Sequence, residues 1–189
     1  MYPSCATFKP RVQSGAQTKG VFIQMGSAAT AELAARAGFD YVVLDQEHGL
    51  GGEDVLLSQL VALSGTPCFP IVRVAWHEAA RFKRALDLGA CGVMVPYVDT
   101  AEQAAAAAAA MRYPPHGGVR GVAKTTRATN FGAAFDEYWT HAVERLLLVV
   151  QIETCAGVDA AEAIARVDGV DVLFVGPTDL SVAIGNGKP

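Results

Sequence analysis

Residues 172–179 read VLFVGPTD: four apolar residues run into a Gly-Pro turn, and a threonine and an aspartate follow. An apolar run without alternating polar residues is typical of a strand buried on both faces, as in parallel sheets. Asp179 therefore follows the downstream end of a buried strand. Residues 146–153, LLLVVQIE, repeat this arrangement with Gln151 and Glu153. Because ligands bind at the carboxyl ends of parallel strands, both stretches indicate an α/β fold with a polar site on one rim of its sheet.

Apolar runs alternate with helical patterns from residue 21 to the last of these strands. The predicted strands are residues 21–25, 41–44, 70–74, 92–96, 146–152 and 172–175. The predicted helices are residues 30–37, 53–63, 78–88, 100–111 and 158–164. Gly38 and Gly89 mark two helix ends, and Thr100 is a candidate N-cap. Strands that are separated by helices predict parallel pairing with right-handed crossovers.

The composition is that of one globular domain: 189 residues, 51% of them hydrophobic, with a formal net charge of −4. This charge excludes the basic surface that nucleic acids and anionic membranes attract, so we expect neither as a partner. No apolar run reaches the ~18–20 residues of a membrane span. We expect residues 1–20 to form a loosely packed N-terminal arm and residues 21–189 to form a single domain.

The cysteines and the first residues of the chain give indications of the cellular compartment of the protein. The cysteines lie far apart and form no C-x-x-C pair, so we interpret them as buried, reduced thiols of a cytoplasmic protein. They are Cys5, Cys68, Cys91 and Cys155. The first acidic residue is Glu32, whereas basic residues occur earlier. An organelle-targeting peptide is therefore the alternative to an arm.

Residues 113–141 interrupt the alternation with the stretch YPPHGGVRGVAKTTRATNFG. Its proline and glycine pairs oppose regular structure, so we expect a long loop, which in a compact domain is usually functional or mobile. Arg120, Lys124 and Arg127 could face an anion. A solvated basic loop is the alternative.

Polar residues gather after the predicted strands, at their downstream ends. They are Asp45, Glu47, His48, Arg73, Gln151, Glu153 and Asp179. The upstream ends of the same strands carry few residues of this kind. One rim of the sheet therefore collects acids, a histidine, an arginine and a glutamine.

This rim predicts metal-assisted chemistry on a 2-oxo acid. Glu153 and Asp179 can share one Mg²⁺ or Mn²⁺ ion and leave other coordination positions for water and substrate oxygens. The metal would stabilise an enolate, and Arg73 could hold the same negative charge. Histidine exchanges protons near neutral pH, which makes His48 a candidate for proton transfer. The turn at residues 176–179 could offer the N–H groups of Thr178 and Asp179 to a carboxylate.

Each candidate also has a structural alternative. Asp179 could be a helix N-cap, Glu153 could form a buried ion pair with Arg73, and His48 could be a capped loop histidine. Asp45 and Glu47 are two positions apart, so at most one of them is expected to contact the ligand directly, while the other orients loops.

Several motifs together resemble a known family. GFDYVVLDQEHG, IVRV, RALDLGACGVMVPYV, RYPPHGGVRGV, VVQIET and VLFVGPTDLS occur in order between residues 21 and 189. As a set they resemble the metal-dependent class II pyruvate aldolases, which belong to a superfamily with the citrate lyase beta-subunit-like enzymes. The resemblance implies a TIM-type (β/α)₈ barrel. It also implies cleavage of 4-hydroxy-2-oxo acids to pyruvate and an aldehyde through a metal-stabilised enolate, and oxaloacetate decarboxylation.

The resemblance also implies residue roles. Glu153 and Asp179 match ligands of a divalent metal, which could be Mg²⁺, Mn²⁺ or Co²⁺. Arg73 matches the residue that binds the keto oxygen, His48 the proton-transfer residue and Asp87 its acidic partner. The substrate-binding positions are Gln151, Gly176, Pro177, Thr178 and Asp45. Glu47 lies in the loop beside them, near the waters of the metal.

Two points depart from this pattern. Asp87 lies at the end of a helix, before a strand, which places it on the opposite rim; a neighbouring subunit of a homo-oligomer could supply it. The family barrel has eight βα units and this sequence shows about six, so we expect a barrel that is incomplete at its C-terminus. The alternative functions are an acyl-CoA lyase of the citrate lyase beta-subunit-like branch and a truncated, non-catalytic remnant.

Overall fold

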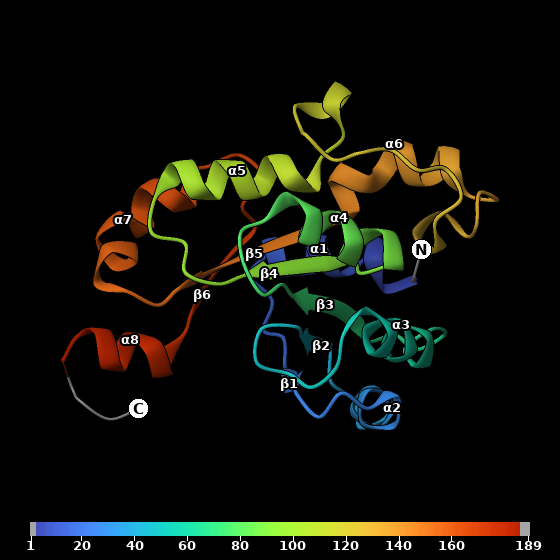
Figure 1. Ribbon diagram of the computed structural model, residues 1–189, viewed down its shortest axis with the longest axis horizontal. Coiled ribbons are helices and arrows are strands. Elements are labelled where there is room, and N and C mark those ends of the chain that lie inside the picture. Colours follow the sequence, from blue (N-terminus) through green and yellow to red (C-terminus); the bar gives the residue numbers. More distant parts are fainter. Residues whose placement is uncertain (1–2, 186–189) are drawn as a thin grey trace.

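The computed structural model describes residues 3–185. Its strands form one six-stranded sheet, in which they lie in the order in which they occur in the sequence (Figure 1). Every neighbouring pair of strands is parallel. The strands are β1 (Gly20–Ile23), β2 (Tyr41–Asp45), β3 (Phe69–Arg73), β4 (Gly92–Val95), β5 (Leu147–Ile152) and β6 (Val172–Val175). All six predicted strands are confirmed, and the sheet is an open half-barrel of the TIM type.

Helices connect the strands and cover one face of the sheet. They are α2 (Ala28–Arg36), α3 (Glu53–Ala62), α4 (Ala79–Leu88), α5 (Ala101–Met111), α6 (Phe135–Arg145) and α7 (Cys155–Ala165), and α8 (Pro177–Ala183) follows the last strand. The Thr100 side chain caps α5 by accepting a hydrogen bond from the N–H of Gln103, as predicted. No helix within residues 3–185 is long and apolar enough to cross a membrane.

Alternate residues of each strand face the inside of the half-barrel, because side chains of a strand point to opposite faces in turn. On β3 this places Phe69, Ile71 and Arg73 on one face, and the register pairs Arg73 with Asp45 of β2. Apolar residues therefore fill the lower layers, and polar residues occupy the last layer at the carboxyl ends. The outer edge of β6 has no strand beside it among the described residues, and Val175 is 57% exposed.

The N-terminal segment is anchored to the rest of the domain by a few residues, while most of its other described side chains are exposed. It forms the short 3₁₀ helix η1 (Pro3–Ala6) and the helix α1 (Phe8–Gln13). Phe8 is buried and stacks on Phe69 with 4.3 Å between ring centroids. The Lys9 ammonium donates to the carbonyl of Leu146 at 2.8 Å and pairs with Asp171 at 3.0 Å. These contacts lie far apart in sequence, and no local pattern could have indicated them.

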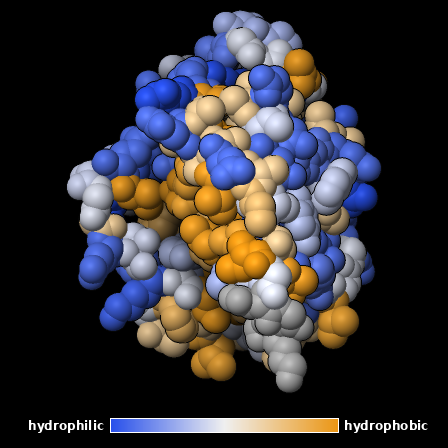
Figure 2. All heavy atoms as spheres, turned by 90° about the vertical axis from the view of Figure 1, so that its left-hand side faces the viewer, coloured by the Kyte–Doolittle hydropathy of each residue, from blue (hydrophilic) through white to orange (hydrophobic). Residues whose placement is uncertain are grey.

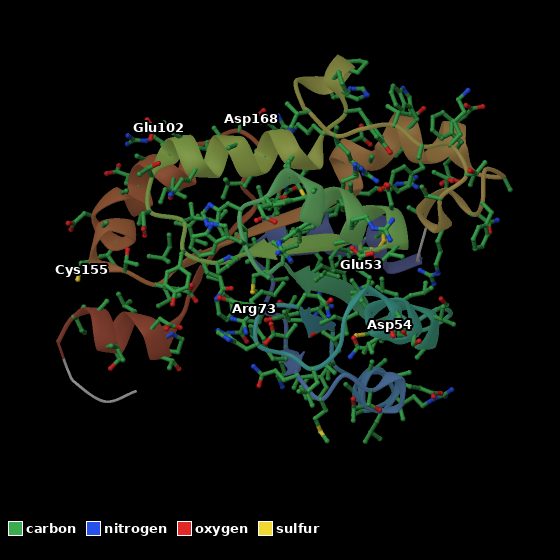
Figure 3. The ribbon with its side chains drawn as sticks, in the orientation of Figure 1. Glu53, Asp54, Arg73, Glu102, Cys155 and Asp168 are labelled. Atoms are coloured by element: carbon green, nitrogen blue, oxygen red, sulfur yellow. A yellow bond between two sulfur atoms is a disulfide. The ribbon has the colours of Figure 1, made fainter. Side chains whose placement is uncertain are left out.

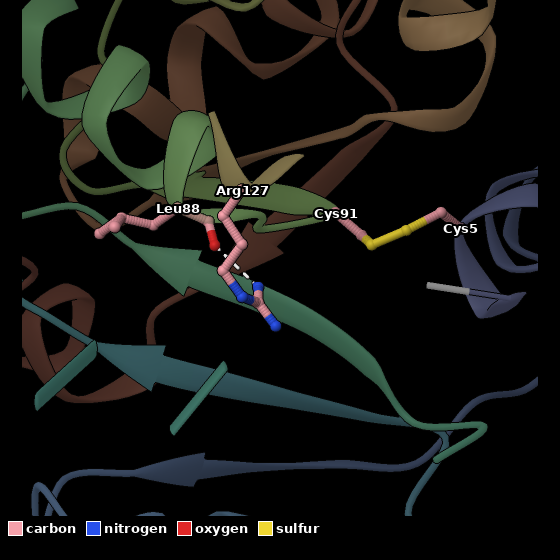
Figure 4. Close-up of a disulfide and its surroundings, with 4 residues drawn as sticks. All are labelled: Cys5, Leu88, Cys91 and Arg127. Atoms are coloured by element: carbon pink, nitrogen blue, oxygen red, sulfur yellow. Dashed lines mark hydrogen bonds between the residues drawn. A yellow bond between two sulfur atoms is a disulfide. The ribbon is translucent and has the colours of Figure 1, made fainter. Parts of the chain in front are cut away.

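A disulfide joins Cys5 of η1 to Cys91, which precedes β4, over a sequence separation of 86 residues (Figure 4). The prediction of reduced thiols is wrong for this pair, and the cytoplasmic location that it supported stays a prediction. Cys68 is a buried thiol whose pKa is raised to about 11, first because burial disfavours the thiolate. Cys155 begins α7 and is exposed, which contradicts the expected burial.

The segment after α5 holds two further 3₁₀ turns, η2 (Pro114–His116) and η3 (Arg127–Thr129), and then α6, which we did not predict. Arg120 is fully buried, donates to the Tyr138 hydroxyl at 2.9 Å, and pairs with Asp87 at 2.8 Å. Arg127 donates to the carbonyl of Leu88 at the end of α4 (Figure 4). Both guanidinium groups therefore fasten this segment to α4, and neither supports the anion-binding interpretation.

Candidate active site

Six of the polar residues predicted for the rim form a connected group at the carboxyl ends of the strands. They are Asp45, Glu47, Arg73, Gln151, Glu153 and Asp179. Arg73 lies at the tip of β3, among the strand ends (Figure 3). Figure 2 shows the molecule from this side, where apolar atoms form a band between hydrophilic flanks.

Arg73 is held in place by two acids of the β2–α3 loop region. Its Nε donates to Oδ1 of Asp45 at 2.9 Å and its Nη2 donates to Oδ2 at 2.5 Å, which is a bidentate pair. Its Nη1 lies 3.0 Å from Oε2 of Glu47. The guanidinium also stacks over the ring of Phe22, 5.0 Å from the centroid. Arg73 is thus fixed, and the alternative that it pairs mainly with Glu153 is wrong.

Asp45 organises the loop that follows β2. Besides Arg73, it accepts hydrogen bonds from the N–H groups of Glu47 and His48 at 3.0 and 3.2 Å, and from the Gln24 side chain at 2.9 Å. Burial by itself would raise the pKa of Asp45, but the hydrogen bonds from Arg73 and Gln24 hold it below its ordinary value. Asp45 is therefore ionised, and it orients both Arg73 and the loop.

Glu153 lies just beyond β5 and is held on both of its oxygens. Oε1 accepts from Nε2 of Gln151 at 2.5 Å, and Oε2 accepts from the N–H of Tyr97 at 3.1 Å. Gly176 is required beside it, because a Cβ at that position would lie 2.3 Å from Oε1 of Glu153. Burial raises the pKa of Glu153, and the charges of Glu47 and Asp179 raise it further. A bound cation would relieve this cost of ionisation.

Asp179 lies in the first turn of α8 and accepts a hydrogen bond from the Tyr97 hydroxyl at 3.0 Å. The N-cap position belongs to Gly176, so the N-cap interpretation of Asp179 is wrong. Pro177 and Thr178 form the exposed start of the same helix. The N–H groups of this first turn have no acceptor within the helix, as at every helix start.

His48 and Asp87 are not brought together within one chain. The His48 side chain is 59% exposed on the rim, and its Nε2 lies 3.6 Å from Oε1 of Glu47. Asp87 sits near the end of α4 and forms the ion pair with Arg120 instead. Only a second subunit could therefore bring an Asp87 side chain to His48.

The donor set on the rim fits a hard divalent cation. Asp45 and Glu47 pair with Arg73, whereas Glu153 and Asp179 have no salt bridge to any residue within 3–185. Oε2 of Glu47 is buried and lies 3.0 Å from Nη1 of Arg73, so this oxygen already faces a cation. No group of three or more His, Cys, Asp or Glu residues there is arranged as a complete metal cage. Two carboxylates with open coordination positions suit Mg²⁺ or Mn²⁺, which retain waters and substrate oxygens.

Sequence reasoning missed Gln24 and Tyr97, although both follow strand ends. Gln24 comes directly after β1 and binds Asp45. Tyr97 comes after β4 and contacts Glu153 and Asp179. The position after a strand was therefore the available signal, but neither residue type by itself suggests catalysis.

Comparisons with known proteins show which family the chain belongs to. The family model of HpcH/HpaI aldolase/citrate lyase matches residues 18–188. The hydroxypyruvate/pyruvate aldolase of Chromohalobacter salexigens is 48% identical over 172 residues, which cover 90% of this chain and 67% of that protein. The 5-keto-4-deoxy-D-glucarate aldolase of Salmonella paratyphi A is 43% identical over 167 residues, which cover 88% of this chain and 64% of that protein.

A solved structure of an HpcH/HpaI aldolase/citrate lyase family protein from Burkholderia cenocepacia superimposes with a TM-score of 0.90 at 39% identity. The match covers 95% of this chain and 72% of that one. The chain thus spans about two thirds of the length of the curated relatives it matches. The resemblance seen in the sequence is confirmed: the chain belongs to the HpcH/HpaI aldolase/citrate lyase family of carbon–carbon lyases.

Proposed function

We propose that this chain carries the active site of a divalent-metal-dependent aldolase that cleaves 4-hydroxy-2-oxo acids to pyruvate and an aldehyde. One observation supports this proposal above the others. Glu153, just after β5, and Asp179, on α8, both contact Tyr97 and have no cationic partner on the rim among the described residues. The fixed guanidinium of Arg73 belongs to the same group of charges.

A divalent cation held by Glu153 and Asp179 (Mg²⁺, Mn²⁺ or Co²⁺) would polarise the 2-oxo group of the substrate. Arg73 would bind the oxygen on which negative charge develops. Its bidentate bond to Asp45 occupies Nε and one N–H of Nη2, and Nη1 lies beside Glu47, which leaves the second N–H of Nη2 for that oxygen. Because Asp45 holds the guanidinium before substrate arrives, little reorganisation would be needed during the reaction.

Substrate orientation would come from the β5 end and the α8 start. Gln151 is buried next to Glu153 and donates one N–H of its Nε2 to Oε1 of Glu153, so the second N–H of Nε2 is suited to donate to a pyruvate oxygen. The N–H groups of Thr178 and Asp179 would bind the substrate carboxylate, and Gly176 and Pro177 shape that turn.

Proton transfer at the C4 hydroxyl would fall to His48, whose exposed imidazole stands on the rim. Its acidic partner, Asp87, would come from a neighbouring subunit, so the proposal includes a homo-oligomer. The aldehyde would leave past His48. Decarboxylation of oxaloacetate would use the same enolate-stabilising groups.

The test is deuterium exchange of the pyruvate methyl group in D₂O, followed by NMR, because exchange reports enolate formation without a chosen aldehyde. Exchange should require Mg²⁺ or Mn²⁺, stop in EDTA, and be lost in Glu153→Ala and Asp179→Ala. Glu162→Ala is the matched control, since Glu162 pairs with Arg166 on the exposed face of α7. Exchange that persists after complete chelation would contradict the metal mechanism. Inhibition by free coenzyme A would favour the acyl-CoA lyase alternative.

A further inference from the structure

Tyr97 adopts a backbone conformation that tyrosine rarely takes. Its φ is +51°, and it is one of three non-glycine residues with positive φ within residues 3–185. A bulky residue in the left-handed region costs free energy and persists only where its surroundings determine it. Hydrogen bonds hold the backbone on both sides of Tyr97. Nε2 of His77 is hydrogen-bonded to the carbonyl of Pro96, and the N–H of Val98 donates to the carbonyl of Gln151 at 3.1 Å.

This conformation lets one residue contact both candidate metal ligands. The N–H of Tyr97 donates to Oε2 of Glu153 at 3.1 Å, and its hydroxyl donates to Oδ1 of Asp179 at 3.0 Å. Glu153 follows β5 and Asp179 lies on α8, so Tyr97 bridges two elements from a third, the loop after β4.

Asp179 depends on this hydroxyl more than Glu153 does. Glu153 is also held by Gln151, whereas the Tyr97 hydroxyl is the one side-chain donor to Asp179 among the described residues. The ring of Tyr97 is itself supported, since the Trp76 ring lies beside it with 6.0 Å between centroids. A donor on Oδ1 restricts rotation of the carboxylate and leaves the Oδ2 lone pairs for another ligand.

We propose that Tyr97 is a positioning residue for the divalent metal: it orders the Glu153 and Asp179 carboxylates through its N–H and its hydroxyl. This inference rests on the proposed function, which assigns those two carboxylates to the metal. Partners that orient ligating groups typically contribute 10–100-fold to metal affinity. The left-handed backbone conformation of Tyr97 allows its N–H to contact Glu153 while its hydroxyl contacts Asp179.

The test is Mn²⁺ binding to the whole chain, measured by titration calorimetry and by the EPR signal of free Mn²⁺. Tyr97→Phe removes only the hydroxyl, and we expect its Mn²⁺ dissociation constant to rise about tenfold. Tyr41→Phe is the matched control because Tyr41 begins β2 at the opposite rim, and its affinity should be unchanged. In an Asp179→Asn background, Tyr97→Phe should add little further loss, because the hydroxyl acts through Asp179.

The outcomes separate the two proposals. If the unmodified chain binds Mn²⁺ and Tyr97→Phe binds it equally well, the positioning role is overturned while the metal site stands. If the unmodified chain binds no Mn²⁺, the proposed function fails and the role of Tyr97 fails with it. Thermal melts report whether each variant folds. If Tyr97→Phe does not fold, Tyr97→Asn repeats the test, since asparagine suits this backbone but is too short to reach Asp179.

Discussion

Replacing Cys5 by alanine removes the covalent link between the N-terminal segment and the start of β4. The link spans a sequence separation of 86 residues, and a loop of that length corresponds to about 4.6 kcal/mol of unfolded-state entropy at 25 °C. Loss of the buried sulfur adds about 1 kcal/mol. We therefore expect Cys5→Ala to lower the free energy of unfolding by about 5–6 kcal/mol.

The assay is urea unfolding followed by circular dichroism, with and without dithiothreitol. Cys68→Ala is the matched control, since Cys68 is also fully buried but lies outside the disulfide. It should cost about 1 kcal/mol and remain sensitive to the reductant, whereas Cys5→Ala should not respond to it. In a thermal melt the difference between the two variants should be about 9–18 °C.

Two results would refute this reasoning. One is a thiol titration of the unfolded, unreduced chain that finds all four cysteines reactive. The other is a free energy of unfolding that is the same for Cys5→Ala and Cys68→Ala. Either result would mean that the packing of Phe8 and Lys9, and not the disulfide, holds the N-terminal segment in place.

Three further predictions concern the rim. Glu153→Gln should weaken Mn²⁺ binding by about 100-fold or more, which titration calorimetry checks. The same change should stabilise the metal-free chain at pH 7, because burial and neighbouring carboxylates raise the pKa of Glu153, and thermal melts check this. Burial raises the pKa of Glu47 as well, so both Glu47 and Glu153 keep protons in the folded chain that they release in the unfolded chain. Without metal, the free energy of unfolding should therefore fall as the pH rises above about 4.3, the pKa of an unfolded glutamate, and continue to fall through the raised pKa values of the folded chain. Urea titrations in EDTA at several pH values would measure this. Arg73→Lys cannot keep the two bonds to Asp45 and should cost about 2–3 kcal/mol in the same titration.

The elements that sequence reasoning found are those with a strong local pattern. Unbroken apolar runs such as β5 and β6 predict strands, and their order along the chain is their order in the sheet. The predicted burial holds along the whole of β5, whereas β6 is only partly buried. Helix α6 was missed because the proline- and glycine-rich stretch before it hid its own signal. That signal is present: Asp136 and Glu137 begin the helix, and Tyr138 and Ala142, four residues apart, are its buried face.

The sequence by itself determined which residues reach the rim, because the residues directly after a parallel strand must lie at its carboxyl end. Only the tertiary structure decided how those residues pair: Arg73 with Asp45 and Glu47, Asp87 with Arg120, and Cys5 with Cys91. The contact between Tyr97 and Asp179 crosses 82 residues. Partners so far apart leave no periodic trace in the sequence, because their meeting depends on the summed geometry of every strand and turn between them.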